Sequence, residues 1–155
     1  MTDMPENSYL DDTTETLLEQ SQQNAQGVIL ATIAVLDDLG LLPEAWADGL
    51  GERFSDAWGM EEVWEPGDFL DAMLTNYRSL GASVDDVSIT DEAASATISG
   101  FPDDELCDVF NVRPEDAMVF HRVAAEIARR RGLRWQWEPA EDATRLIVTP
   151  LPDRE

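Results

Sequence analysis

Residues 83–98 read SVDDVSITDEAASATI, and in this stretch the spacing of hydrophobic residues changes from helical to alternating. Hydrophobic and polar residues alternate on both sides of Asp91 and Glu92, a pair suited to a turn; the alternating hydrophobic residues are Val87, Ile89, Ala94, Ala96 and Ile98. Alternation on both sides of a turn predicts a β-hairpin.

A second alternating stretch lies near the end of the sequence. Leu133, Trp135 and Trp137 alternate with polar residues, a turn is expected over 139–142, and Leu146 and Val148 follow. Two hairpins joined by one long helix predict a four-stranded antiparallel sheet with helices packed on one of its faces. Small alanines opposite large tryptophans would leave a hollow between the sheet and those helices.

The residues before the first hairpin have helical spacing. We expect a first helix over 12–39, where Asp12 and Glu15 are spaced as a capping box. Its stretch 28–36 is apolar on nearly all sides, which favours a place in the middle of the core or in a dimer interface. A second helix is expected over 43–59, irregular at its glycines, and a third over 68–80.

Two further helices are expected between the hairpins, a short one over 103–110 and a long one over 115–131 that follows Pro114 and ends at Gly132. The fold class is therefore α+β: three N-terminal helices, then hairpin, helix and hairpin. We expect a single domain over 12–150. The acidic residues 1–11 and the tail 151–155 are predicted to be disordered.

Charge excludes some partners. The chain has 33 acidic and 10 basic residues, a net charge of −23, and no lysine. A carboxylate-rich surface is typical of proteins from high-salt or high-GC organisms, and a surface for a basic protein or a mimic of DNA is the alternative. Phosphate backbones are repelled by such a charge, so we expect no nucleic-acid binding. The longest apolar run, nine residues at 28–36, is too short to cross a bilayer, and no membrane partner is expected.

Cysteine usage and motifs limit the chemistry. Cys107 is the only cysteine, which rules out an internal disulfide and a zinc site built on several thiolates. We find no secretory signal and expect the cytoplasm. No phosphate loop, dinucleotide fingerprint, EF-hand, HExxH or GxSxG pattern is present, and we therefore predict neither a cofactor nor a metal.

Three residues are candidates for catalysis. His121 is the only histidine, and its helical position places it at the edge of an apolar face. Cys107 would form a nucleophile and base with His121 if the two side chains met, although a buried, inert thiol is the simpler interpretation. Arg122 could bind a carboxylate ligand or pair with a local acid. The run 129–131 of arginines is explained by the negative end of the helix dipole.

Aromatic residues are the candidates for binding. Trp46, Phe54 and Trp58 lie on one face of the second helix, and Trp135 and Trp137 lie on one face of a strand. We expect these five side chains to line or back an apolar pocket, with ordinary core packing as the alternative for each.

Three stretches resemble a known family: Gly81-Ala-Ser-Val84, Ile98-Ser-Gly-Phe-Pro102 and Gly132-Leu-Arg-Trp-Gln-Trp137. With the element order, they resemble vinyl-reductase-type (hydrocarbon-binding) domains and the related L-2-amino-thiazoline-4-carboxylic acid hydrolase-like group. The resemblance implies an apolar pocket between sheet and helices, in a dimer. Family members often carry cysteines near the last hairpin. Residues 135–148 contain none, and so no metal or thiol chemistry is carried over.

The leading hypothesis is a small-molecule-binding or accessory domain for an apolar or aromatic molecule. One alternative is a small hydrolase or isomerase of secondary metabolism that uses His121 as general base. Another is an acidic protein-interaction subunit. A protein partner and a homodimer are the other expected partners.

Overall fold

The computed structural model describes residues 13–58 and 63–152. The predicted disorder of residues 1–11 lies outside this range, as do residues 153–155 of the predicted disordered tail 151–155. Leu151 is described, and its N–H donates to the Gly132 carbonyl at 3.0 Å. The elements, in chain order, are α2 (Thr14–Asp38), α3 (Pro43–Trp58), α4 (Pro66–Arg78), β1 (Ser83–Ile89), β2 (Ala94–Ser99), α5 (Asp104–Phe110), α6 (Pro114–Ala117), the 3₁₀ turn η1 (Met118–His121), α7 (Arg122–Arg129), β3 (Leu133–Ala140) and β4 (Ala143–Pro150).

The two predicted hairpins form one antiparallel sheet, in the order β1-β2-β4-β3. The central strands β2 and β4 join the hairpins, with Ala94 opposite Val148 and Ile98 opposite Thr144. A register shift in β1 lies between Asp85 and Ser88. The α+β class, the three N-terminal helices and the four-stranded sheet are confirmed.

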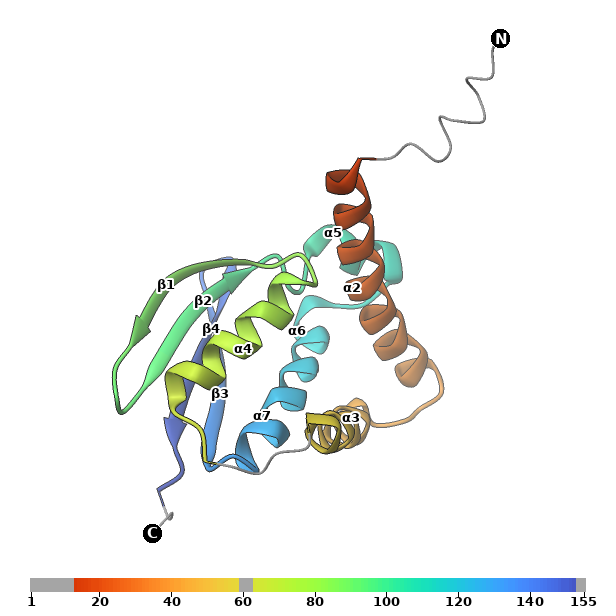
Figure 1. Ribbon diagram of the computed structural model, residues 1–155. Helices are drawn as coiled ribbons and strands as arrows, with labels where there is room; N and C mark the ends of the chain where they lie inside the picture. Colours follow the sequence, from red (N-terminus) through yellow and green to blue (C-terminus); the bar gives the residue numbers. More distant parts are fainter. Residues whose placement is uncertain (1–12, 59–62, 153–155) are drawn as a thin grey trace.

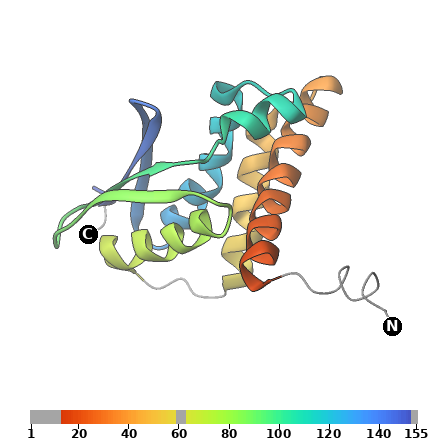
Figure 2. The same cartoon turned by 90° about the horizontal axis from the view of Figure 1, so that it is seen from above.

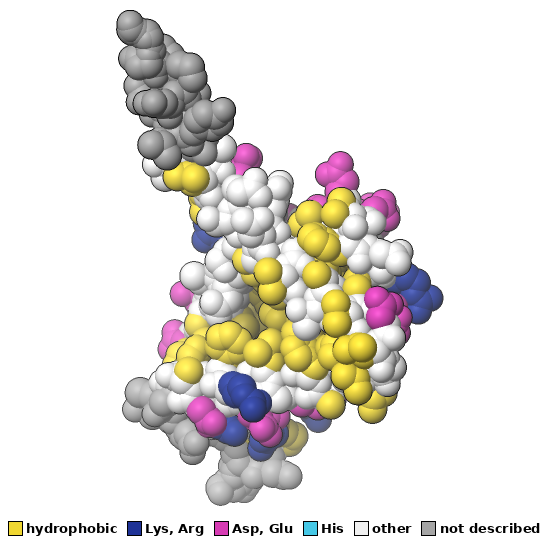
Figure 3. All heavy atoms as spheres, turned by 90° about the vertical axis from the view of Figure 1, so that its right-hand side faces the viewer, with side chains coloured by type: hydrophobic (Ala, Val, Ile, Leu, Met, Phe, Trp, Pro, Cys, Tyr) yellow, Lys and Arg dark blue, Asp and Glu magenta, His cyan; other side chains and the backbone are white. Residues whose placement is uncertain are grey.

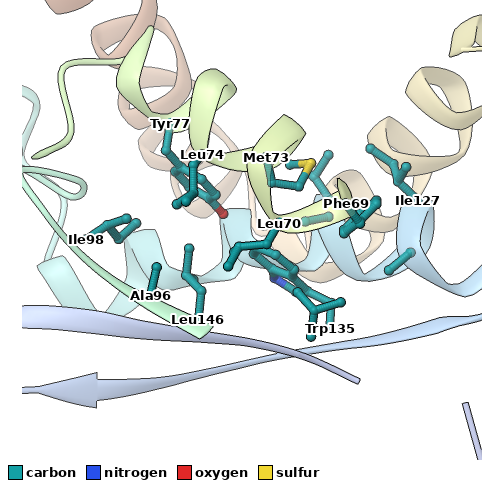
Figure 4. Close-up of a cluster of buried hydrophobic side chains, with 14 of the residues drawn as sticks. Phe69, Leu70, Met73, Leu74, Tyr77, Ala96, Ile98, Ile127, Trp135 and Leu146 are labelled. Atoms are coloured by element: carbon teal, nitrogen blue, oxygen red, sulfur yellow. The ribbon is translucent and has the colours of Figure 1, made fainter. Parts of the chain in front are cut away.

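Helices cover one face of this sheet. In Figures 1 and 2, α4 and α7 lie against the strands, and α2 and α3 lie beyond them. The sheet carries the small residues Ala94 and Ala96 where helices cover it, and both are almost fully buried. Figure 4 shows α4 side chains reaching the strands; the labelled residues of this cluster include Phe69, Leu70, Leu74, Tyr77, Ile98, Trp135 and Leu146. Side chains therefore fill the layer between the sheet and α4.

The second helix is a regular α-helix despite its two glycines. A Cβ atom on Gly51 would lie 2.7 Å from the carbonyl oxygen of Val123 and 2.8 Å from the Cβ of Glu126. No side chain fits at that separation, so glycine is what allows α3 to lie directly on α7. The expected irregularity of this helix was wrong, because close helix packing uses the glycine.

The first helix differs from expectation in two ways. It begins at Thr14, and its N-cap is Thr13, whose side chain accepts a hydrogen bond from the Thr16 N–H at 3.0 Å. Asp12, the predicted cap, lies outside the described residues. The apolar stretch is also not in the middle of the core, since Val28 is 67% and Val35 52% exposed; its other predicted place, a dimer interface, stays a prediction. The helix packs on one side of the molecule, and one apolar face points outward.

The predicted long helix over 115–131 is broken into α6, η1 and α7. A 3₁₀ turn has about 3.0 residues per turn instead of 3.6, and it shifts the phase of every residue after it. His121, which ends this turn, is fully buried rather than at the edge of the apolar face. The edge position was wrong because the projection assumed one uninterrupted α-helix.

Candidate functional site

An apolar groove of about 450 Å³ lies among the helices. Helices α2 and α3 form its walls, and α4, α7 and the 3₁₀ turn form its floor. Figure 3 looks onto this face, where hydrophobic side chains surround a hollow between α2 and α3. The lining residues are Val28, Ile29, Thr32, Trp46, Leu50, Phe54, Trp58, Met73, Asn76, Tyr77, Ser79, Leu80, Phe120, Val123, Ala124 and Ile127.

The lining of this groove contains no charged side chain. Its polar groups are neutral, and two of them already contact residues three or four positions away in the sequence. The Thr32 hydroxyl donates to the Val28 carbonyl at 2.7 Å, and Asn76 Nδ2 lies 3.9 Å from Met73 Sδ. Charged residues make up 28% of the whole chain, so an uncharged lining is a distinct chemical feature of this face.

Three of the five predicted binding aromatics line this groove. Trp46, Phe54 and Trp58 come from one face of α3, as the four-residue spacing predicts, and Phe54 is 48% exposed. The other two lie elsewhere. Trp135, on β3, is buried beneath α4 and stacks on Tyr77 with ring centroids 6.4 Å apart, and Trp137 lines a separate cleft.

The location of the hollow also differs from expectation. We expected a pocket between the sheet and the helices, but core side chains fill that layer. The groove instead lies on the side of α4 and α7 that faces α2 and α3. Its aromatic lining agrees with the sequence interpretation, whereas its position depends on how α2 and α3 pack on α4 and α7.

His121 lies in a ring of aromatic side chains. Its Nδ1 is 2.5 Å from the Tyr77 hydroxyl, and the rings of Phe101 and Trp137 lie 5.8 and 5.7 Å from its ring centroid. Burial lowers the pKa of His121 to about 3 and raises the pKa of Tyr77 above its ordinary value. The imidazole is therefore neutral near pH 7, and its Nε2 has no hydrogen-bond partner within the described residues. A fully buried, weakly basic imidazole does not favour the general-base role.

Cys107 does not join His121. It packs with Leu30, Ile33, Val112 and Ala117, in a cluster apart from the aromatic ring around His121. Burial, followed by the nearby carboxylates of α5 and its N-cap, raises the pKa of Cys107 to about 11. The thiol is protonated near pH 7, and the geometry assigns it to packing.

Arg122 pairs with a local acid. Its Nε and Nη2 donate to the two carboxylate oxygens of Asp48 at 2.9 and 2.8 Å. This two-point contact joins α7 to α3 and occupies the guanidinium edge that would otherwise bind a ligand carboxylate.

Two buried polar residues were missed by the sequence interpretation. Arg131 is fully buried: its Nη1 donates to Ser55 Oγ at 2.8 Å, and its guanidinium lies over the rings of Trp58 and Trp64. The helix dipole therefore does not explain this arginine. Gln26 is 1% exposed. Helical spacing carried a signal for both, because Gln26 lies four residues before buried Leu30 and Arg131 four residues after buried Ile127.

No family model matches this sequence, and the comparisons with curated proteins and with solved structures also give no match. The resemblance to hydrocarbon-binding domains stays a prediction. Within residues 13–58 and 63–152, no three His, Cys, Asp or Glu side chains gather as metal ligands. The same described helices include none with the length and apolar character needed to span a bilayer. The geometry of the groove is therefore the strongest indication of function.

Proposed function

We propose that this chain is a binding domain whose groove between α2 and α3 takes a small, neutral, apolar or aromatic molecule. The observation that carries the proposal is the uncharged, aromatic-walled lining. Its volume of about 450 Å³ falls within the range of ligand pockets, roughly 300–1,000 Å³. Since the chain carries 23 excess negative charges and the lining offers no cation, an anionic ligand would meet repulsion without a partner.

The lining also indicates the shape of the ligand. Trp46, Phe54 and Trp58 present flat rings along one wall, which suits a planar or extended hydrophobic body. Asn76 on the floor, whose Nδ2 already contacts Met73 Sδ, supplies a neutral amide oxygen that can accept one hydrogen bond. A ring system or hydrocarbon chain with a single neutral polar group fits these features. The cytoplasm is the location we propose, because a lone cysteine suits a reducing compartment.

A fluorescence titration with N-phenyl-1-naphthylamine, a neutral apolar probe, tests this proposal. We expect saturable binding with a Kd of about 10–100 μM, the affinity that a probe of this size gains in an apolar site. The variant Thr32→Trp places an indole on the α2 wall of the groove, and it should weaken binding at least about tenfold. Thr32 is partly exposed, so the larger side chain can project into the groove without entering the core.

The matched control is Ser21→Trp, which adds the same side chain to an exposed position of α2 outside the groove lining. It should bind the probe as the wild type does, and thermal unfolding checks that both variants fold. Equal binding by Thr32→Trp and the wild type would place the probe elsewhere, and a wild type that shows no saturable binding would end the proposal.

A further inference from the structure

Exposed leucines gather at the corner between α2 and α3, away from the groove lining. Leu39, Leu41 and Leu42 are 66%, 54% and 71% exposed. Single exposed leucines are common, but three within four consecutive positions form a contiguous apolar patch. Such a patch is a candidate surface for contact with another molecule.

Backbone hydrogen bonds hold this loop in place. The Gly40 N–H donates to the Asp37 carbonyl at 3.0 Å, and the Leu41 N–H donates to the Leu36 carbonyl at 2.9 Å. Gly40 has φ of 72°, the left-handed conformation with which such a helix end closes. The loop is fixed by these contacts at the end of α2, so outward-pointing leucines are built into the local fold.

The patch borders a cleft of about 910 Å³, which runs from the end of α2 to α6 and η1. Its apolar lining includes Ile33, Leu41, Leu42, Phe110, Val112 and Trp137. This cleft shares no lining residue with the groove of the proposed function. It is therefore a second surface, and its role does not depend on the groove.

The rim of the cleft is acidic. Asp37, Asp38 and Glu44 line it, and none of them forms an ion pair of 4.0 Å or less among the residues that the structure describes. Asp37 interacts at longer range with Arg113, and Glu44 with Arg122. Both arginines of the lining are already neutralised: Arg113 by Asp116, with Nε 3.1 Å from Oδ2, and Arg122 by Asp48. The cleft thus combines apolar side chains with an excess of acidic over basic residues in its lining.

We propose that this corner cleft docks a basic amphipathic segment of another protein. Leucine-type side chains of that segment would cover Leu41, Leu42 and the cleft floor, and its Lys or Arg residues would meet the acidic rim. Charge complementarity selects this occupant. A second copy would itself carry a net charge of −23 and would be repelled, and an anionic membrane surface would be repelled in the same way.

The test uses a synthetic helical peptide in which leucines at i, i+3, i+4 and i+7 alternate with lysines, and a second peptide with glutamate for every lysine. We expect the lysine peptide to bind with a Kd in the micromolar range, and to bind more weakly as salt rises from about 0.05 to about 0.3 M. The glutamate peptide should not bind. The double variant Leu41→Ser/Leu42→Ser, at exposed positions, should weaken binding at least about fivefold while the fold is retained.

Two charge variants separate docking at the cleft from general attraction to an acidic protein. Asp37→Asn/Asp38→Asn removes two charges at the rim, and Asp91→Asn/Glu92→Gln removes two at the β1–β2 turn, on the opposite side of the molecule in Figure 1. The first should weaken binding at least about fivefold and the second less than about twofold. Equal effects of the two charge variants, or wild-type binding by the leucine variant, would overturn the proposal. So would a self-associated dimer that the leucine variant dissociates in analytical ultracentrifugation.

Discussion

Replacing Gln26 with methionine is expected to lower the free energy of unfolding by about 2–4 kcal/mol. Gln26 Nε2 donates to the carbonyls of Leu80 and Gly100 at 2.9 and 3.1 Å, and its Oε1 accepts from the Asp103 N–H at 2.8 Å. Methionine has a similar volume but forms none of these bonds, so three backbone groups lose their partners in a largely buried setting. Urea unfolding followed by circular dichroism measures the change.

Gln22→Met is the matched control, one turn earlier on the same helix. The Gln22 side chain is half-buried and donates a single bond, exposed to solvent, to the Arg78 carbonyl at 3.0 Å. Its replacement should lower the free energy of unfolding by less than about 1 kcal/mol, because water replaces the lost partner. If the two variants were equally stable, Gln26 would not be the link between α2 and the loops that follow α4 and β2.

A loss of stability between pH 7 and pH 4 is expected to depend on His121. In the unfolded chain this imidazole takes up a proton near its ordinary pKa of 6.5, whereas burial lowers its folded pKa to about 3. Between pH 6.5 and about pH 3 the unfolded state therefore binds more protons than the folded state. The contribution of neutral, buried His121 to the free energy of unfolding is complete above pH 6.5 and is lost as the pH falls through this range. At pH 4 the loss amounts to about 3 kcal/mol.

The variant His121→Gln isolates this effect from the titration of the many carboxylates. Glutamine does not ionise in this range, and its amide oxygen can still accept from the Tyr77 hydroxyl. We expect the stability difference between the wild type and this variant to shift by about 3 kcal/mol, in the variant's favour, from pH 7 to pH 4. Urea titrations at each pH measure it. A difference that stays constant with pH would mean that His121 remains accessible to protons in the folded chain.

Local periodicity was enough to predict the four strands and the helices α2 to α5. Alternation over 83–98 and 133–148 indicates both hairpins, and the spacing of Phe69, Leu70 and Met73 gives the buried face of α4. The joining of the two hairpins into one four-stranded sheet was also predicted, but the sequence did not indicate that β2 and β4 would be the strands that pair. Periodicity failed at Met118–His121, because a 3₁₀ turn leaves no clear sequence signal and shifts the phase of the residues after it.

The candidate site was predicted only in part, for a physical reason. Four-residue spacing places Trp46, Phe54 and Trp58 on one face of α3, and that face does line the groove. Alternation places Trp135 and Trp137 on one face of β3 but does not say what covers them. Which helix lies over a strand, and where two helices diverge, depends on tertiary packing. The groove could not be located before that packing was known.

The most direct test of the binding role is a methyl-resolved NMR titration of the wild-type chain with N-phenyl-1-naphthylamine. The groove predicts saturable shift changes for the methyl groups of Leu50, Val123 and Ile127, which line it, with Leu41 and Leu42 at the corner unaffected. Shifts confined to the corner leucines, or no saturable shift at the groove methyls, would contradict the account.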